Sequence, residues 1–293
     1  MTFLFRRLVI VGVGLIGGSF GLAAKRRGLV EEVIGFGRTE ANLRIALQRG
    51  IIDSYTFDAA EASVGTDLLL LAVPVRATRP IMQQFVPHLP PGCVITDAGS
   101  VKAAIVGTLE SVLPDHLPFV PAHPIAGTEN AGATAAFETL FDDHLCILTP
   151  TEKTHETPLS RIRTLWEGVG MRVEEMDPQI HDQLLAQVSH LPHLIAFSVM
   201  NGLVDAVSQR IDPLPYAGSS FSDLTRVASS PTEMWRDICL DNKAALLAAI
   251  TNFECALARM KEAIHEGDGE AISSDIERAR EERNRLTNLK ERK

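Results

Sequence analysis

A glycine-rich segment near the start of the chain, Gly12-Val13-Gly14-Leu15-Ile16-Gly17, constrains the fold more than any other feature. It separates an apolar run at 8–13, which we expect to be a buried strand, from a helical pattern at 17–27. In that setting the first glycine permits a tight turn, the second lets the backbone approach a pyrophosphate, and the third lets the helix pack closely on the strand. The free N–H groups and the positive dipole end of the helix then face the phosphates. The segment predicts a dinucleotide site, with an unliganded glycine-rich turn as the weaker alternative, and its expected contacts are Gly12, Gly14, Leu15, Ile16, Gly17 and Ser19.

The first 176 residues alternate short apolar runs with helical patterns. Continuous apolar strands that alternate with helices imply a parallel sheet covered on both faces. Because such connections are right-handed, the sequence predicts a doubly wound, Rossmann-type parallel sheet. Strands are expected at 8–13, 32–37, 67–73, 93–97, 119–122, 146–149 and 171–175, and helices at 17–27, 40–49, 76–86, 101–112 and 159–169.

The pattern changes after Asp177-Pro178. Pro192 lies inside the first long helical pattern and should kink that helix. The sequence therefore predicts an α/β fold with a dinucleotide-binding domain at 1–176 and an all-helical domain at 177–293. No convincing strand follows residue 179, and helices are expected at about 179–209, 220–230, 231–265 and 268–289.

Charge balance and cysteine usage bear on the kind of partner. The net charge is −9 and the pI about 5.5, whereas a nucleic-acid-binding face would be basic. The four cysteines show no metal-ligand spacing, so we expect reduced thiols in a cytoplasmic protein and no metal site. The apolar run after Arg7 leads into a glycine-rich helix start rather than a cleavage site, and no apolar stretch is long enough for a membrane span. Neither a nucleic acid nor a membrane is an expected partner.

The residues after the second expected strand bear on the choice of cofactor. NAD enzymes usually place Asp or Glu there to accept a hydrogen bond from the ribose 2′-hydroxyl. This chain has Phe36-Gly37-Arg38-Thr39 instead. The guanidinium of Arg38 could pair with a 2′-phosphate, with Thr39 assisting, so NADP is favoured. NAD stays possible, because Arg38 could stack on adenine and Glu40 is close in sequence.

Polar residues gather in two segments that each follow an expected strand. These are Asp97-Ala98-Gly99-Ser100-Val101-Lys102 and His123-Pro124-Ile125-Ala126-Gly127-Thr128-Glu129. Their position places Ser100 and His123 at the carboxyl edge of the sheet, where ligands bind in such folds. A lone histidine is more often structural, but the Pro, Gly and Thr in the loop expected around His123 favour a functional one.

Two further polar segments lie in the helical part. His190 and His193, in Ser189-His190-Leu191-Pro192-His193, share one helix face, but no third metal ligand is evident for them. Arg226 lies among small polar residues in Ser222-Asp223-Leu224-Thr225-Arg226, which suits a carboxylate clamp. A surface ion pair of Arg226 with Asp223 or Asp237 is the alternative.

Together these segments resemble the prephenate/arogenate dehydrogenases, the cyclohexadienyl dehydrogenase family of tyrosine biosynthesis. HPIAGTE and SHLPH are far more specific than the glycine segment. The resemblance implies a Rossmann domain followed by a helical dimerisation domain, and hence a homodimer. The matching stretches, in the family's order, are GVGLIGGSFG (12–21), TDAGSVK (96–102), HPIAGTENAG (123–132), SHLPH (189–193), SDLTRVA (222–228) and MWRDICLDNK (234–243).

The reaction that this resemblance implies is the oxidative decarboxylation of a cyclohexadienol with hydride transfer to NAD(P). Prephenate would give 4-hydroxyphenylpyruvate and arogenate would give tyrosine, and the residues do not distinguish the two substrates. By position, His123 would accept the hydroxyl proton beside Ser100, and Arg226 would pair with a carboxylate, most simply the one on the ring. The other family contacts would be His193, His190, Thr128, Glu129 and Trp235 toward the substrate, and Val73, Pro74 and Val75 toward the cofactor.

The chain departs from the family pattern in places, and other functions stay open. It lacks the acidic residue of NAD-specific members, and we expect neither a fused chorismate mutase domain before Leu8 nor a C-terminal ACT regulatory domain. A β-hydroxyacid dehydrogenase or an imine reductase would share the two-domain plan. The hydroxyacid enzymes rely on a lysine of the interdomain helix, however, and residues 179–210 contain none. A non-catalytic dinucleotide sensor would leave His123, Ser100 and Arg226 unexplained.

Overall fold

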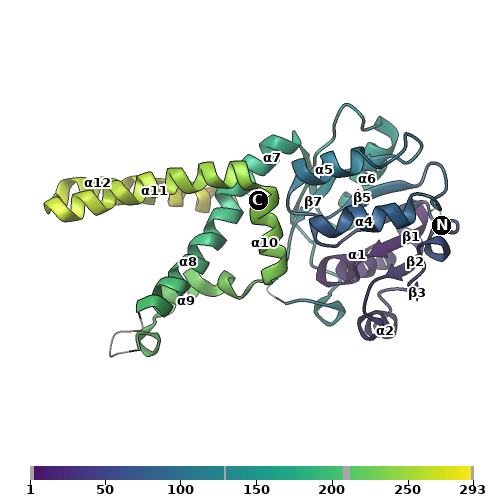
Figure 1. Ribbon diagram of the computed structural model, residues 1–293, viewed down its shortest axis with the longest axis horizontal. Helices are drawn as coiled ribbons and strands as arrows, with labels where there is room; N and C mark the ends of the chain where they lie inside the picture. The colour runs from purple at the N-terminus through teal and green to yellow at the C-terminus, as the bar shows by residue number, and fades with distance from the viewer. Residues whose placement is uncertain (1–2, 129, 207–211, 292–293) are drawn as a thin grey trace. The chain divides into compact units, whose positions relative to one another are not determined.

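The computed structural model of the protein describes residues 3–128, 130–206 and 212–291 (Figure 1). Its internal contacts divide the chain into two compact units, residues 1–243 and 244–293. The long helices α11 (Lys243–Glu266) and α12 (Gly269–Glu291) account for the second unit. The domain boundary expected after residue 176 lies within the first unit and stays a prediction.

A parallel sheet forms the frame of the first unit. Within the described residues it has six strands in the order β3-β2-β1-β4-β5-β6. The direction of strand addition reverses between β1 and β4, which is the topological switch point where such sheets bind ligands. The predicted doubly wound fold is confirmed, although the short strand β3 was not predicted because its Ser-Tyr-Thr sequence has no apolar run. The strands are β1 (Phe5–Val11), β2 (Val30–Phe36), β3 (Ser54–Thr56), β4 (Leu68–Leu71), β5 (Val94–Asp97) and β6 (Phe119–Val120).

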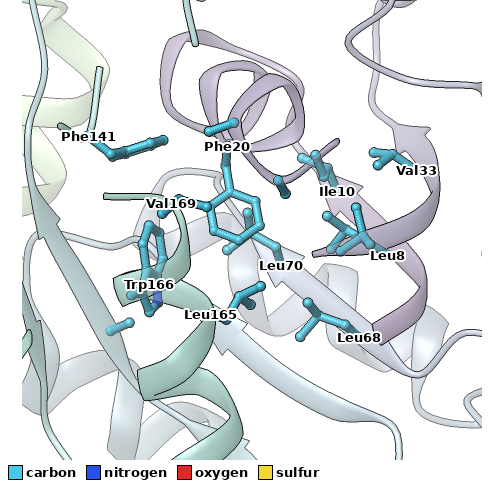
Figure 2. Packing of buried hydrophobic residues seen from close by; sticks show 14 of the residues in the cluster. Leu8, Ile10, Phe20, Val33, Leu68, Leu70, Phe141, Leu165, Trp166 and Val169 are labelled. Carbon is cyan, nitrogen blue, oxygen red and sulfur yellow. The ribbon is translucent and has the colours of Figure 1, made fainter. Parts of the chain in front are cut away.

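Alternate residues of the central strands enter two separate cores. Leu8 and Ile10 of β1 pack in one cluster, and Val9 of the same strand packs in the other. The first core is shown in Figure 2, where the ring of Phe20 meets the indole of Trp166 at a centroid distance of 4.8 Å. Helices α1 (Leu15–Arg26), α2 (Glu40–Gln48) and α6 (Glu156–Gly168) supply the first core, and α3 (Ala59–Ser63), α4 (Val75–Phe85) and α5 (Lys102–Glu110) supply the second.

A second, three-stranded sheet corrects the expectation of a single parallel one. It consists of β7 (Ala122–Ile125), β8 (Leu145–Leu148) and β9 (Arg172–Glu175), and β7 runs antiparallel to β8. Pro121 separates β6 from β7, and proline has no N–H with which to continue the first ladder. His123 was expected in a loop beyond a strand, but it lies inside β7 opposite Ile147.

Helices make up the described part of the chain after β9, as predicted. A π-helical turn at Ala186–His190 directly precedes α8. It accommodates Pro192, which has no N–H to donate to a carbonyl one turn back. The single helix expected at 231–265 is divided into two helices, α10 and α11. The break lies at Asn242, whose backbone is not helical. Among the described residues, no helix is long and apolar enough to cross a membrane. The further elements are a 3-10 turn at Ala133–Ala135, α7 (Pro178–Leu185), α8 (Leu191–Ala206), α9 (Ser219–Thr225), α10 (Thr232–Asp241) and 3-10 turns at Leu214–Tyr216 and Arg226–Ser229.

Candidate active site

The glycine loop lies at the switch point, between β1 and α1. Gly12 has φ +93°, and a Cβ there would lie 2.4 Å from the carbonyl oxygen of Ala72. A Cβ at Gly17 would lie 2.3 Å from the Gly12 oxygen, so the helix approaches the strand as closely as the motif requires. A Cβ at Gly14 would meet nothing within 4 Å. That open space before the N-terminus of α1 fits a pyrophosphate, and the first turn of α1 contains no acidic residue to repel one.

Other residues expected at the cofactor lie close to this loop, with one correction. Val73 and Pro74 lie between β4 and α4, and Val75 is the first residue of α4. A Val73 methyl would lie 2.8 Å from a Cβ at Gly12. Leu15 and Ile16 begin α1. Ser19 is fully buried, and its hydroxyl accepts a hydrogen bond from the N–H of Phe137. Ser19 therefore supports packing and does not reach a phosphate.

The end of β2 adjoins the same loop, because the Gly12 N–H donates to the Phe36 carbonyl at 2.9 Å. Arg38 and Thr39 follow β2 and are exposed. Within the described chain, Arg38 has no hydrogen bond or ion pair with another side chain. The nearby Glu40 carboxylate is held by the Arg44 guanidinium at 2.6 Å, which lowers the pKa of Glu40.

His123 forms the first link of a buried hydrogen-bonded chain. Its Nδ1 lies 2.8 Å from Nε2 of His181, and Nδ1 of His181 lies 2.8 Å from a carboxylate oxygen of Asp182. The Asp182 carboxylate also accepts the backbone N–H groups of Lys102 and Ala103, at 2.8 and 2.9 Å. The second polar segment is thereby connected to the start of α5 and to α7.

A buried lysine supports the strand that carries His123. The ammonium of Lys102 donates to the Asp97 carboxylate and to the Ala122 carbonyl, and both side chains of the ion pair are fully buried. Burial lowers the pKa of His123 well below its usual value of 6.5, and the charges of His181, Lys102 and His190 lower it further. The His123 ring is therefore neutral near pH 7, as a proton acceptor must be.

His190 and His193 have different surroundings, although they share a helix face. His190 is buried, with Nδ1 3.1 Å from the Asn242 amide nitrogen, and burial lowers its pKa to about 4. His193 is half-buried and stacks on Trp235 with ring centroids 3.8 Å apart. Its Nδ1 lies 2.9 Å from the Ser189 carbonyl and so carries the hydrogen, which leaves Nε2 of the neutral ring as an acceptor.

Arg226 is near His193, at the junction of α9 and the following 3-10 turn. Burial lowers the pKa of His193, and the positive charge of Arg226 lowers it too, whereas the bond to Ser189 raises it. Next to them is an open cavity of about 680 Å³, whose walls include Phe197, Thr225, Arg236 and Trp235. The Trp235 indole N–H is buried and has no hydrogen-bond partner among the described residues.

An apolar cluster joins the polar segments of the sheet to those of the helices. Val101 packs with Trp235 and Ile238, and Val75 and Phe197 lie against the same cluster. Ser100, half-buried, immediately precedes Val101. Thr128 is exposed, and its hydroxyl accepts the Asn130 N–H at 3.3 Å. Glu129 lies outside the described residues.

Sequence reasoning missed the partners of His123. His181 and Asp182 come shortly after Asp177-Pro178, where they have the pattern of an ordinary helix start. Asp97 and Lys102 were noted only as members of a polar segment, without a role, and Asn242 was not singled out. A histidine followed by an aspartate at the beginning of the helical region was the available signal, but their partners are distant in sequence. No group of three or more His, Cys, Asp and Glu side chains in the described chain is placed to hold a metal ion.

Comparison with known proteins gives the same family along most of the chain. Residues 20–175 match the family model described as prephenate dehydrogenase, nucleotide-binding domain, and residues 177–277 match prephenate dehydrogenase, dimerization domain. A cyclohexadienyl dehydrogenase of Zymomonas mobilis is 38% identical over 270 residues, or 92% of each chain. The structure of A. aeolicus prephenate dehydrogenase in complex with hydroxyphenyl propionate and NAD+ is 36% identical, with a TM-score of 0.91 over 96% of this chain and 98% of that one. Synechocystis arogenate dehydrogenase is 26% identical, with a TM-score of 0.80 over 96% of this chain and 100% of that one.

Two alanine substitutions in the glycine loop should affect different properties, one the stability of the fold and the other the binding of the dinucleotide. Gly17→Ala should lower the free energy of unfolding by about 1–3 kcal/mol, because its Cβ collides with the Gly12 carbonyl. Gly14→Ala should leave stability unchanged but weaken dinucleotide binding by about tenfold or more, because its methyl fills the space assigned to the pyrophosphate. Urea unfolding and calorimetric titration with NAD and NADP measure both effects. Unchanged cofactor affinity in Gly14→Ala would contradict the assignment.

Proposed function

The chain belongs to the prephenate dehydrogenase family, and on that premise we propose that it oxidises and decarboxylates a cyclohexadienol, prephenate or arogenate, with NAD(P) as the hydride acceptor. The observation that carries the proposal is His123, a buried histidine whose Nδ1 is engaged by His181 and whose ring is neutral near pH 7. Its Nε2 is then the acceptor for the hydroxyl proton of the substrate. Ser100, at the carboxyl edge of β5, is proposed to orient the same hydroxyl.

The chemistry asks the protein for proton transfer and orientation. When the hydroxyl proton leaves, the C–O bond becomes a carbonyl as the carbinol hydrogen departs with its electron pair. Breaking the bond to the ring carboxylate then releases CO2, and its electron pair completes the aromatic ring. The former carbonyl oxygen becomes a phenolate and takes back the proton that the base had accepted. The main requirements are a base that is unprotonated at neutral pH and a fixed position of the substrate ring.

The cofactor supplies the hydride-accepting ring when it is bound. Gly12, Gly14, Leu15, Ile16 and Gly17 are proposed to hold its pyrophosphate at the N-terminus of α1. Val73, Pro74 and Val75, between the end of β4 and the first residue of α4, are proposed to line the nicotinamide side.

For the 2′ position we propose a preference for NADP over NAD. Arg38 is exposed next to the loop, while Glu40 is engaged by Arg44 and is less available to a ribose hydroxyl. The A. aeolicus relative was solved with NAD+, and NAD is therefore kept as the second cofactor in the proposal.

The substrate carboxylates are assigned to the helical side of the site. We propose that Arg226 pairs with the ring carboxylate. Nε2 of His193 and the Trp235 N–H, which has no partner within the described part of the chain, are proposed to make further polar contacts. His190, held by Asn242, is proposed to keep this helix face in place, and Thr128 and Glu129 to complete the pocket.

The helical region is proposed to be both a substrate domain, beginning at 177, and the interface of a homodimer that works in the cytoplasm. The family model for residues 177–277 is a dimerization domain. Large apolar side chains are exposed on the helices of the second unit, as an interface between copies requires, and they include Leu257, Ile264, Ile276 and Leu286.

A direct assay tests the proposed reaction. The purified protein, given prephenate or arogenate with NAD or NADP, should form reduced nicotinamide, and His123→Asn should lower kcat by about 10²–10⁴-fold, the usual contribution of a general base. Dinucleotide affinity and the unfolding midpoint should stay as in the wild type. No reduction with any of the four pairs would refute the function, and side-by-side kinetics would determine which substrate is preferred.

The cofactor preference depends on a single side chain. Arg38→Ala should raise the KM for NADP by about 10–100-fold, the equivalent of lost charge-assisted hydrogen bonds, and change the KM for NAD little. Arg6→Ala is a matched control, because Arg6 is also exposed but lies at the start of β1, away from the glycine loop that follows the end of this strand. If Arg38→Ala affected both cofactors equally, the 2′-phosphate contact would be wrong.

The carboxylate clamp predicts an effect on KM. Arg226→Ala should raise the KM for the dienol by about 10–100-fold with little change in kcat, because a ground-state contact contributes uniform binding. Arg226→Lys should lose less, since it keeps the charge but not the bidentate geometry. In a Trp166→Phe background, Trp235 is the sole tryptophan and its fluorescence can report product binding. An unchanged KM in Arg226→Ala would exclude the clamp.

A further inference from the structure

His181 is a fully buried titratable side chain to which the proposed reaction gives no role of its own. It lies in α7, between His123 in β7 and Asp182, with nitrogen–nitrogen and nitrogen–oxygen distances of 2.8 Å on its two sides. Two histidines in contact form a hydrogen bond only when one ring nitrogen donates and the other accepts. The arrangement therefore restricts where protons can be.

The carboxylate of Asp182 determines which atom donates and which accepts in each hydrogen bond of this series. A carboxylate accepts, so Nδ1 of His181 carries a hydrogen and Nε2 of its neutral ring is a lone-pair acceptor. Nδ1 of His123 must then donate to that lone pair. The unprotonated nitrogen of His123 is consequently Nε2, the atom that the proposed reaction needs as its base.

The charges around the two rings differ. Burial lowers the pKa of both, but the carboxylate of Asp182, next to His181, opposes this effect at His181 by a hydrogen bond and by its charge. The ammonium of Lys102 lowers the pKa of both rings, and among the described residues no hydrogen bond joins His123 to a carboxylate. A positive charge is therefore held better on His181 than on His123. The charged or titratable groups that face the pair are Asp182, Lys102, Asp97, His190 and the thiol of Cys146, whose pKa burial raises well above its usual value.

We propose that His181, fixed by Asp182, is a positioning residue that sets the tautomer of His123 and takes over the proton that His123 receives from the substrate. This inference rests on the proposed function. The substrate O–H bond breaks and its proton bonds to Nε2 of His123. The Nδ1–H bond of His123 breaks in turn, and that proton bonds to Nε2 of His181. The positive charge then lies on His181 against the carboxylate of Asp182, and the reverse transfers return the proton to the phenolate oxygen that decarboxylation leaves on the product.

The pH dependence follows from the same geometry. With one extra proton on the pair, Nε2 of His123 is protonated whichever ring holds the charge, so activity is lost as the pH falls through the pKa of the pair. Without His181 the proton would have to reside on His123 alone, beside Lys102 and away from Asp182. Protonation then becomes harder, and the acid limb moves to lower pH. A residue with a merely structural role would not move this limb.

The experiment compares His181→Phe and His181→Gln with the wild-type enzyme, using whichever dienol and cofactor the wild type accepts. The phenylalanine removes both hydrogen bonds, whereas the glutamine carbonyl can accept from Nδ1 of His123 but cannot take a proton. His181→Phe should lose kcat by about 10–100-fold, the size of effect seen when outer partners of functional histidines are removed. The loss in His181→Gln should be smaller. In both, the acid limb of kcat/KM should lie at lower pH and the KM for the dienol should stay within about twofold, since no ground-state substrate contact is removed.

Two outcomes would overturn the proposal. One is an acid limb at the wild-type pH in both variants, and the other is a loss expressed mainly in KM. Cofactor affinity and the unfolding midpoint identify a misfolded His181→Phe, in which case His181→Gln alone decides. His123→Asn distinguishes this failure from failure of the proposed function. If His123→Asn is as active as the wild type, His123 is not the base, whereas an inactive His123→Asn beside unaltered His181 variants refutes only the role of His181.

Discussion

One carboxylate, that of Asp182, connects the parts of the first unit that make up the site. The helix α5 begins after Val101, whose apolar side chain cannot cap it. Its first N–H groups instead donate to the carboxylate of Asp182, which lies 80 residues after Lys102 in the sequence. A negative charge at a helix N-terminus is favourable, and buried N–H groups without a partner would be costly. Because the same carboxylate also orients His181, the start of α5 and the base of the proposed reaction depend on one another. The backbone carbonyl of Asp182 extends the network to Asn242, at the end of α10.

A buried ion pair completes the arrangement from the side of the sheet. Lys102 and Asp97 are both fully buried, and such pairs are weak contributors to stability because desolvation offsets much of their attraction. Their geometry assigns them a different role here. Lys102 donates at 2.6 Å to the carbonyl of Ala122, the residue before His123, and Asp97 accepts the Ala122 N–H. The pair thus fixes the backbone of β7 at the base, and the positive charge of Lys102 adds to the effect of burial, which is the main reason that the His123 ring is neutral.

Local patterns predicted the fold better than the site. The apolar runs, the glycine segment and the helical periodicity follow from neighbouring residues, so the doubly wound sheet and the helical region could be predicted. The antiparallel β7 could not, because an apolar run contains no information on strand direction, and Pro121 alone did not reveal the change of sheet. Ser19 was misassigned because a helix start shows which residues are near a loop but not which way they face. The contact between His123 and His181 spans 58 residues, and no periodicity of either segment specifies it.

The distribution of charge suits the order of events in the proposed reaction. With neutral histidines, the buried network of Lys102, Asp97 and Asp182 has one net negative charge. As a hydride leaves the carbinol carbon, the substrate becomes electron-poor and its hydroxyl more acidic, and a preorganised negative environment favours the departing proton at that moment. Uptake of one proton makes the network neutral, whereas a second would give it a net positive charge in a buried setting, which is costly. The cation assigned to the ring carboxylate, Arg226, belongs to a different element, at the end of α9, so it can hold that carboxylate until it leaves as CO2 without competing for the proton.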